Sequence, residues 1–221
     1  MMNEAKMTEL TQVKDVAYFR ADLCLYSQES YSLEEKKEIC NNMMATSVAI
    51  RKELMRAYAR EQLDRITVKG LCAAVPVART TFYAHYRNVD DVLLEVEDAL
   101  LAGLAEVTGR VSGGDLPRMD FSAFLDKTLA FVGQNRDDVH ALLVAQPDAR
   151  FIRRWKNAVK ANIALRYPQA RALPNWDLLA EMAASAVIGA YTWWMEHPGA
   201  TGEDEAKRAV ARAVEAIAAS L

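Results

Sequence analysis

The chain has 221 residues, of which 52% are hydrophobic and 26% are charged, and its formal net charge at pH 7 is −3. These values are typical of a globular protein of one or two domains that buries a sizeable core. Only 9 Gly and 6 Pro are present while Ala, Leu, Glu and Arg are common, so the composition favours an all-α fold over a β-rich one.

Short-range patterns argue against several classes of protein. Cys24, Cys40 and Cys72 have neither CxxC spacing nor a nearby histidine cluster, which disfavours a zinc site or a disulfide framework. The N-terminus lacks the apolar segment of a signal peptide, and the longest uncharged run, Met182–Met195, is too short to span a bilayer. We find no nucleophile–base pair, metal-ligand spacing or phosphate-binding loop. We therefore expect a cytoplasmic protein that is not an enzyme and binds no cofactor.

The charge is unevenly distributed along the chain. Residues 1–49 carry 5 Lys and Arg against 8 Asp and Glu, residues 50–89 carry 8 against 3, and residues 90–221 carry 14 against 19. An acidic protein with one basic segment is typical of a chain that docks one surface onto a polyanion. The charge count alone leaves open that the surplus is a chance feature of a solvated face.

An N-terminal extension is predicted over residues 1–42. Within it, Thr8–Tyr26 has apolar residues at a spacing that would suit an amphipathic helix. The pair Met43–Met44 could itself begin a protein. The extension is therefore either an appendage or the result of an over-extended start site.

A long helix is predicted where the extension ends. Ser32 and Glu35 form a capping box at its start, and no Pro or Gly interrupts the chain as far as Gln62. This segment is either one helix or two helices separated near Asn41–Asn42. Its apolar residues share one face, with basic residues mostly outside it, as in a helix that packs on a core.

Two short helices and a turn follow, and they form the motif on which the functional argument rests. Thr67 is a good N-cap for a helix over Val68–Ala74. Pro76 ends that helix, because the residue before a proline is pushed out of the α region. A second short helix is predicted over Ala78–His85, and Asn88 caps a third helix with acidic residues in its first turn.

The rest of the chain is predicted to be helical, with two loops marked by Gly and Pro at residues 112–117 and 167–175. The expected helices are Asn88 to about Gly109, Phe121–Gln134, Arg136–Gln146, residues 147–166, Trp176–Glu196 and Glu203–Leu221. The helix over Trp176–Glu196 is apolar almost all round, so it should be buried on more than one side. The expected fold is all-α, with about nine or ten helices.

Two helices of about eight residues are unstable alone in water, so the motif requires a core shared with a third helix. Apolar residues that supply this core are Ile66, Val68, Leu71, Cys72, Val75, Val77 and Phe82. The residues then left on the outside of the second short helix are Arg79, Thr80, Thr81, Tyr83, Ala84 and His85. Arg pairs with guanine, Thr reaches a base or a phosphate, and Ala contacts a thymine methyl group, while Tyr and His suit phosphate oxygens. A helical hairpin that packs against another element is the alternative.

The run ITVKGLCAAVPVARTTFYAHYRNVDDVLLEV resembles the DNA-binding domain of the tetracycline-repressor (TetR/AcrR) family of bacterial transcription regulators. The resemblance covers about residues 48–97, and order, spacing and residue types agree together. Matching residues are Ile66, Thr67, Val68, Val77, Arg79, Thr81, Phe82, Tyr83, His85, Tyr86, Asn88, Asp91 and Leu93. The resemblance implies a helix-turn-helix domain of three helices over residues 43–97. It also implies a helical regulatory and dimerisation domain over residues 98–221, which is matched only in layout.

By this resemblance, the motif contacts both the bases and the backbone of DNA. The residues expected to face bases are Arg79, Thr80 and Ala84, and those expected to hold phosphates are Thr67, Lys69, Thr81, Tyr83, His85 and Arg87. Pro76 stands where the family usually has Gly, so the turn is expected to be tighter or differently angled. Val89 stands where the family often has Lys, and Arg87 would partly replace that phosphate contact.

The family acts as a homodimer through its last two long helices, where small residues permit close approach. The residues expected in the interface are Ala183, Ala186, Gly189, Ala190, Trp193, Val210, Val214 and Ile217. The resemblance also implies a small-molecule effector of unknown identity. The candidates for lining its pocket, equally compatible with a plain core, are Phe124, Phe131, Trp155, Tyr167, Met182 and Tyr191.

The resemblance therefore implies a ligand-responsive repressor that binds a palindromic double-stranded DNA operator as a homodimer. The alternative is a DNA-binding or scaffolding protein of the same fold that has no effector and acts through a protein partner. The sequence leaves open the operator, the regulated genes, the effector, the choice between repression and activation, and whether residues 1–42 belong to the native protein.

Overall fold

The computed structural model of the protein describes residues 33–109, 121–166 and 168–218, some of them by their backbone alone. The described residues form nine α-helices, α3 to α11, with short 3-10 and π-helical segments and no strand, which confirms the all-α fold. None of the described helices combines the length and the apolar character that crossing a membrane requires. The predictions for Thr8–Tyr26, the capping box of Ser32 and the loop over residues 112–117 lie outside the described residues.

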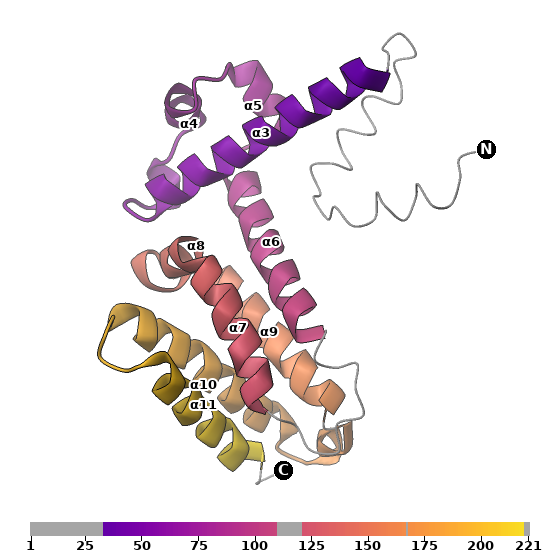
Figure 1. Ribbon diagram of the computed structural model, residues 1–221, viewed down its shortest axis with the longest axis vertical. Helices are drawn as coiled ribbons and strands as arrows, with labels where there is room; N and C mark the ends of the chain where they lie inside the picture. Colours follow the sequence, from indigo (N-terminus) through magenta and orange to yellow (C-terminus); the bar gives the residue numbers. More distant parts are fainter. Residues whose placement is uncertain (1–32, 110–120, 167, 219–221) are drawn as a thin grey trace, which may run out of the picture. The chain divides into compact units, whose positions relative to one another are not determined.

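The chain divides into two compact units, of which unit 1 ends at Ala99 and unit 2 begins at Leu100. In unit 1, α3 (Leu33–Tyr58) is a single helix, followed by the 3-10 turn Leu63–Arg65, α4 (Val68–Ala74) and α5 (Arg79–His85). Figure 1 shows α4 and α5 side by side along α3. The helix α6 (Val89–Gly109) starts in unit 1 and ends, as predicted, at Gly109.

The long helix α3 differs from its prediction at its C-terminal end. It runs unbroken through Asn41–Asn42, but it stops at Tyr58 and not at Gln62. Tyr58 is the last buried side chain of the helix, while residues 59–62 are exposed. Beyond Tyr58, therefore, continued helix would gain no apolar burial to offset its conformational entropy.

Unit 1 is closed by an apolar core with a polar network beside it. The side chains of Ile50, Leu54, Phe82, Val92 and Leu93 are completely buried. They come from α3, α5 and α6, so the short helix α5 shares its core with two longer helices, and α4 adds the buried Leu71 and Cys72. This is the shared core that two short helices require.

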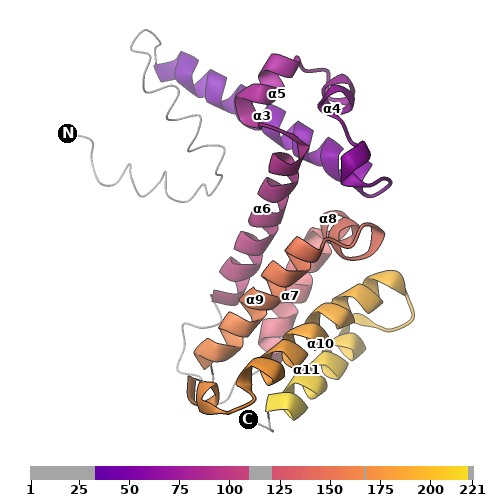
Figure 2. The same ribbon diagram turned by 180° about the vertical axis from the view of Figure 1, so that it is seen from behind.

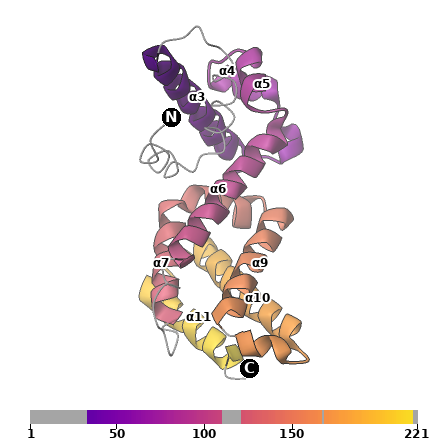
Figure 3. The same ribbon diagram turned by 90° about the vertical axis from the view of Figure 1, so that its right-hand side faces the viewer.

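Unit 2 is a bundle of longer helices. Its elements are α7 (Phe121–Gln134), α8 (Arg136–His140), the π-helical segment Ala141–Ala145, α9 (Ala149–Arg166), the 3-10 segment Pro168–Ala172, α10 (Trp176–Glu196) and α11 (Glu203–Ala218). In Figure 2, α10 and α11 lie side by side as an antiparallel hairpin. Figure 3 shows α7 beside α11 and α9 beside α10. The bounds of α7 and α10 agree with the prediction.

Two predicted elements of unit 2 are corrected. The helix expected over Arg136–Gln146 is α-helical only to His140 and continues as a π-helical segment. The loop expected over residues 167–175 contains the 3-10 segment Pro168–Ala172. Ala141, Leu142 and Leu143 of the π-helical segment are buried, so that departure lies in a packed part of the bundle.

Candidate functional site

The ends of the short helices are held by side-chain caps. The Gly70 amide donates to Oγ1 of Thr67 at 3.1 Å, which confirms Thr67 as the N-cap of α4. The Asp91 amide donates to Oδ1 of Asn88 at 2.8 Å, which confirms the cap of α6. Each bond satisfies an amide that has no partner within its own helix.

The turn between α4 and α5 is the most strained point of the described backbone. Pro76 has a φ of +20°, and it is the sole described residue other than glycine with a positive φ. The Val77 amide donates to the Cys72 carbonyl at 3.0 Å, which is the outer bond of a Schellman motif with Pro76 at C′. That position favours Gly, because proline lacks an N–H and its ring holds φ near −65°. The second helix nevertheless forms, as the sequence predicted.

Helix α5 buries one side and exposes the other. Phe82 is completely buried, and its ring meets that of Tyr86 at a centroid distance of 5.6 Å. On the outside, Tyr83 is 58% exposed. The exposed residues of the helix are Arg79, Thr80, Tyr83 and Ala84. The structure thus brings the three predicted base-facing residues together on one solvent-facing surface, while Thr81 and His85 are half-buried at its edge.

The remaining predicted phosphate contacts surround this helix in the sequence. Thr67 and Lys69 are exposed at the start of α4. Arg87 is exposed after α5, and its Nε lies 3.0 Å from Oδ2 of Asp91. The Arg87 amide donates to the same oxygen at 3.0 Å. Asp91 therefore orients the arginine that was expected to replace the missing lysine at Val89.

The pKa of His85 is shifted by its surroundings. Partial burial of the ring removes water from the charged form, so the pKa of His85 lies below its ordinary value of 6.5. The imidazole is therefore neutral at pH 7. In this state the side chain can hydrogen-bond to a phosphate oxygen without adding a positive charge.

Only some residues of the predicted core of the motif are fully buried. Ile66, Leu71 and Cys72 are buried, with exposed fractions of 7% or less. The three valines of the predicted core, Val68, Val75 and Val77, are half-buried. Their positions beside the turn leave one side of each open to solvent.

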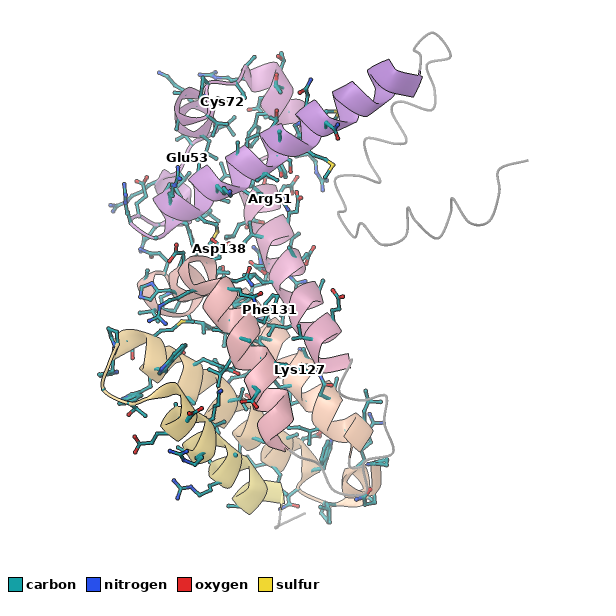
Figure 4. All side chains as sticks on the ribbon, viewed as in Figure 1. Arg51, Glu53, Cys72, Lys127, Phe131 and Asp138 are labelled. Atoms are coloured by element: carbon teal, nitrogen blue, oxygen red, sulfur yellow. The ribbon has the colours of Figure 1, made fainter. Side chains whose placement is uncertain are left out.

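A polar network in unit 1 was missed by the sequence analysis. Oγ of Ser47 lies 2.9 Å from the phenol oxygen of Tyr86, and both residues are buried. Nearby, Nη1 of Arg51 lies 3.1 Å from Oε1 of Glu95 as an ion pair without hydrogen-bond alignment; Figure 4 labels Arg51 on α3. Burial raises the pKa of Tyr86 far above its usual value. The sequence contained one indication of this network. Ser47 is a polar residue that lies three and seven positions before the buried residues Ile50 and Leu54 of its own helix, and therefore on the buried face of that helix.

The residues expected to line an effector pocket do not all lie around one cavity in the structure. Trp155 and Tyr191 stack at a ring distance of 5.4 Å, and the Tyr191 and Thr128 hydroxyls lie 2.7 Å apart. The cavity beside them measures about 20 Å³, which holds at most about one water molecule. Burial raises the pKa of Tyr191 to about 12.

The other pocket candidates lie elsewhere. Phe131, labelled on α7 in Figure 4, fills the space beside Gly103, where an added Cβ would come within 2.3 Å of its ring. Met182 is 48% exposed and does not line the cavity beside Trp155. Tyr167 and the side chain of Phe124 lie outside the described residues.

Helix α10 carries an uncovered apolar stripe. Leu178, Met182 and Trp193 are 62%, 48% and 44% exposed, and Gly189 between them is also exposed, with no heavy atom near the position of an added Cβ. Within the single chain, α10 packs on both α9 and α11, which agrees with the expectation of burial on more than one side, and these four residues lie on the face that remains exposed. We call Leu178, Met182, Gly189 and Trp193 the α10 stripe.

The residues expected in a dimer interface are distributed unevenly around this stripe. Ala183 is 3% exposed and faces the interior of unit 2. Gly189 and Trp193 lie on the stripe, and Ala186, Ala190 and Val210 are half-buried. The side chains of Val214 and Ile217 lie outside the described residues.

No protein-family model and no curated protein matches the sequence. Among solved structures, the chain is similar to a TetR transcriptional regulator from Streptococcus agalactiae, with a TM-score of 0.60, 23% identity, and coverage of 79% of this chain and 96% of that one. A fatty acid degradation regulator from Bacillus halodurans has a TM-score of 0.59 and 10% identity, with coverage of 78% of this chain and 94% of that one. A TetR-family transcriptional regulator from Bordetella parapertussis has a TM-score of 0.55 and 17% identity, with coverage of 77% of this chain and 93% of that one. At these identities the likeness shows the fold, which is that of TetR-family transcriptional regulators.

Proposed function

We propose that this protein is a transcriptional regulator of the tetracycline-repressor family that binds a palindromic DNA operator as a homodimer and responds to a small-molecule ligand as a repressor. The observation that carries the proposal is α5, whose buried Phe82 leaves Arg79, Thr80 and Ala84 exposed together. Charge supports it, because residues 50–89 hold the positive surplus of an acidic chain.

The expected contacts divide into two groups. Arg79, Thr80 and Ala84 read bases in the major groove, where a bidentate arginine–guanine pair discriminates against a wrong base by about 1–3 kcal/mol. Thr67, Lys69, Thr81, Tyr83, His85 and Arg87 hold the phosphate backbone, which positions the helix without reading sequence. In this arrangement, Asp91 holds the Arg87 side chain in place for its phosphate.

The α10 stripe supports a homodimer. Its exposed apolar side chains are of the kind that a second copy covers, and the open space at Gly189 permits two helices to cross closely. A two-fold dimer would present its recognition helices about 34–36 Å apart, one turn of DNA, and would call for a palindromic site. A Gly189→Trp variant should raise the dimer dissociation constant in sedimentation experiments, whereas Gly133→Trp on α7, where space is also open, should not.

The ligand response is expected to be a shift of population. An effector that binds better to a conformation with the wrong spacing of recognition helices lowers operator affinity by that difference in binding free energy. The helix α6, which starts in unit 1 and ends in unit 2, is the element through which we expect the change to pass.

A gel-shift experiment with the promoters of the protein's own gene and its neighbours tests the proposal. We expect saturable, salt-sensitive binding to at least one of these fragments. Arg79→Ala should relax sequence preference, whereas Thr81→Ala should weaken binding evenly across sequences. Arg153→Ala, an exposed arginine on α9, is the matched control and should change neither. If no fragment binds, the protein is not a local regulator, and an unchanged sequence preference in Arg79→Ala removes that residue from the base-reading group.

The second candidate is a DNA-binding or scaffolding protein of this fold that has no small-molecule effector and acts through a protein partner. The small cavity beside Trp155 favours it, because a volume of about 20 Å³ accepts no metabolite without rearrangement. A thermal-shift screen with metabolites separates the two candidates, since a ligand that binds the native state alone raises its melting temperature.

A further inference from the structure

Unit 2 has an open depression of about 490 Å³ between α9, the 3-10 segment Pro168–Ala172 and the start of α10. Figure 3 shows these elements together at one end of the bundle. The volume falls within the range of about 300–1,000 Å³ that is usual for small-molecule pockets. The depression is thus large enough to take an organic ligand as it stands, unlike the cavity of about 20 Å³ beside Trp155.

The depression faces away from the α10 stripe. Its lining residues Trp176 and Ala180 each lie two positions from Leu178 of the stripe, so they point about 160° away from it on a helix of 3.6 residues per turn. Among the described residues, the lining includes none from α11 and none of those expected in the dimer interface. A second copy that covers the α10 stripe would therefore leave the depression accessible.

The apolar part of the lining suits a flat ring. Ala161 and Ala164 of α9 and Ala180 of α10 are small, so they leave space between two packed helices that larger side chains would fill. The half-buried Trp176 adds an indole ring to this lining. Aromatic rings pack well on an indole in offset or edge-to-face arrangements, so the depression favours an aromatic ligand over an aliphatic one of the same size.

The charged groups at the depression carry a positive surplus. Lys160, a lining residue, shares one carboxylate with Lys156, because their Nζ atoms lie 2.8 Å and 3.0 Å from the two carboxylate oxygens of Glu181. The hydrogen bonds from Lys160 and Lys156 lower the pKa of Glu181, so this group is ionised at pH 7 and balances one of the two lysines. Arg171, also in the lining, is exposed and takes part in none of the ion pairs found among the described residues.

Asp177 is the acidic residue of the described lining. It lies in the first turn of α10, where the helix dipole favours a carboxylate, so the helix itself accounts for its position. With Asp177 included, the charged groups around the depression comprise three cations, Lys156, Lys160 and Arg171, against two carboxylates. The Arg171 guanidinium is the cation left over, and it can donate two parallel hydrogen bonds to the carboxylate of a ligand.

We propose that this depression is a binding site for a small aromatic carboxylate, whose charged group pairs with Arg171 and whose ring packs against Trp176. Lys160 adds to the positive potential that attracts the anion. The proposal goes beyond DNA binding and does not rest on it, because every residue of the described lining belongs to unit 2.

Calorimetric titration of the full chain tests the site with three probes that share one aromatic body. They are 1-naphthaleneacetate, 2-(1-naphthyl)ethanol and 2-(1-naphthyl)ethylamine. We expect the anion to bind once per chain and at least about tenfold more tightly than the neutral alcohol, with the cationic amine weakest. Arg171→Gln should reduce the affinity for the anion to that for the alcohol. Arg153→Gln, which removes an exposed arginine of α9 outside the lining, should leave the affinity unchanged.

Three further variants locate the site. Ala161→Trp, at an exposed position of α9, fills the depression and should abolish binding of the anion, with the helical content unchanged by circular dichroism. Asn162→Ala alters the lining of the small cavity beside Trp155 and should not affect binding. Gly189→Trp, which obstructs the α10 stripe, should not affect binding either, because the depression lies on the other side of α10.

Several results would overturn the proposal. They are absence of binding by the anion, equal affinity for the three probes, unchanged affinity in Arg171→Gln, and loss of binding in Asn162→Ala or Gly189→Trp. Gel shifts on the same preparations separate this site from the proposed function. A protein that binds the anion but no DNA retains the site and loses the regulatory assignment, whereas a protein that binds DNA but none of the probes loses the site and retains the assignment.

Discussion

Replacing Pro76 by Gly should stabilise unit 1. In the Schellman turn after α4, this position requires a positive φ and offers an amide to a helix carbonyl, and proline supplies neither without strain. A residue held in a sparsely populated backbone region costs about 1–3 kcal/mol, and the hydrogen bond that Gly could restore adds about 0.5–1.5 kcal/mol. The greater freedom of Gly in the unfolded chain subtracts about 1 kcal/mol. The net gain is then about 0.5–3.5 kcal/mol.

Hydrogen exchange followed by mass spectrometry is the suitable measurement. The four tryptophans, at positions 155, 176, 193 and 194, all lie in unit 2, so tryptophan fluorescence does not report on unit 1. A gain of 1.4 kcal/mol slows exchange through unfolding about tenfold. We therefore expect amides of α4 and α5 in Pro76→Gly to exchange roughly tenfold more slowly, and those of α10 to be unchanged.

Two control variants isolate the cause. Pro174→Gly changes a proline that has no positive φ, so it should be neutral or destabilising by up to about 1 kcal/mol. Pro76→Ala restores the amide but keeps a Cβ at positive φ, so it should stabilise less than Pro76→Gly. If Pro76→Gly exchanges faster than the wild type, or if Pro76→Ala matches it, the strain at this turn has been assigned wrongly.

Three other substitutions test contacts inside the units. Tyr86→Phe leaves the buried Ser47 hydroxyl without its partner and should cost about 1–3 kcal/mol in urea unfolding, whereas adding Ser47→Ala should recover part of the loss. Gly103→Ala places a Cβ within 2.3 Å of the Phe131 ring and should cost about 1–3 kcal/mol, which a second substitution, Phe131→Leu, should reduce. The pKa of His85 is lower in the folded protein than in the unfolded chain, so the unfolded chain binds a proton at this residue more readily. The stability that His85 confers is therefore present above pH 6.5 and is lost as the pH falls through the lower folded pKa. Exchange of unit 1 amides at pH 7.5 and 5.5 should show this loss in the wild type and a smaller one in His85→Gln.

Local features of this protein are readable from its sequence. The caps at Thr67 and Asn88 and the limits of α10 follow from hydrogen bonds and apolar spacing within a few residues, so no distant contact is needed to predict them. The outer surface of α5 was also predictable, because removal of Phe82 from the helix leaves few apolar residues to bury. The prediction failed at the end of α3, where burial of Tyr58 and not the helical pattern determines the last turn.

Features that depend on residues distant in the sequence were decided by the tertiary structure alone. Ala183 and Met182 are neighbours on an apolar helix, yet one is buried and the other exposed, because α10 packs on α9 and α11 and leaves only a narrow face open. Tyr191 meets Thr128, 63 positions away, and their hydrogen bond leaves only a small cavity where a pocket was expected. Composition and periodicity determined that this chain forms amphipathic helices. Which of their apolar side chains close a core and which remain for a ligand or a second copy depends on how those helices pack together.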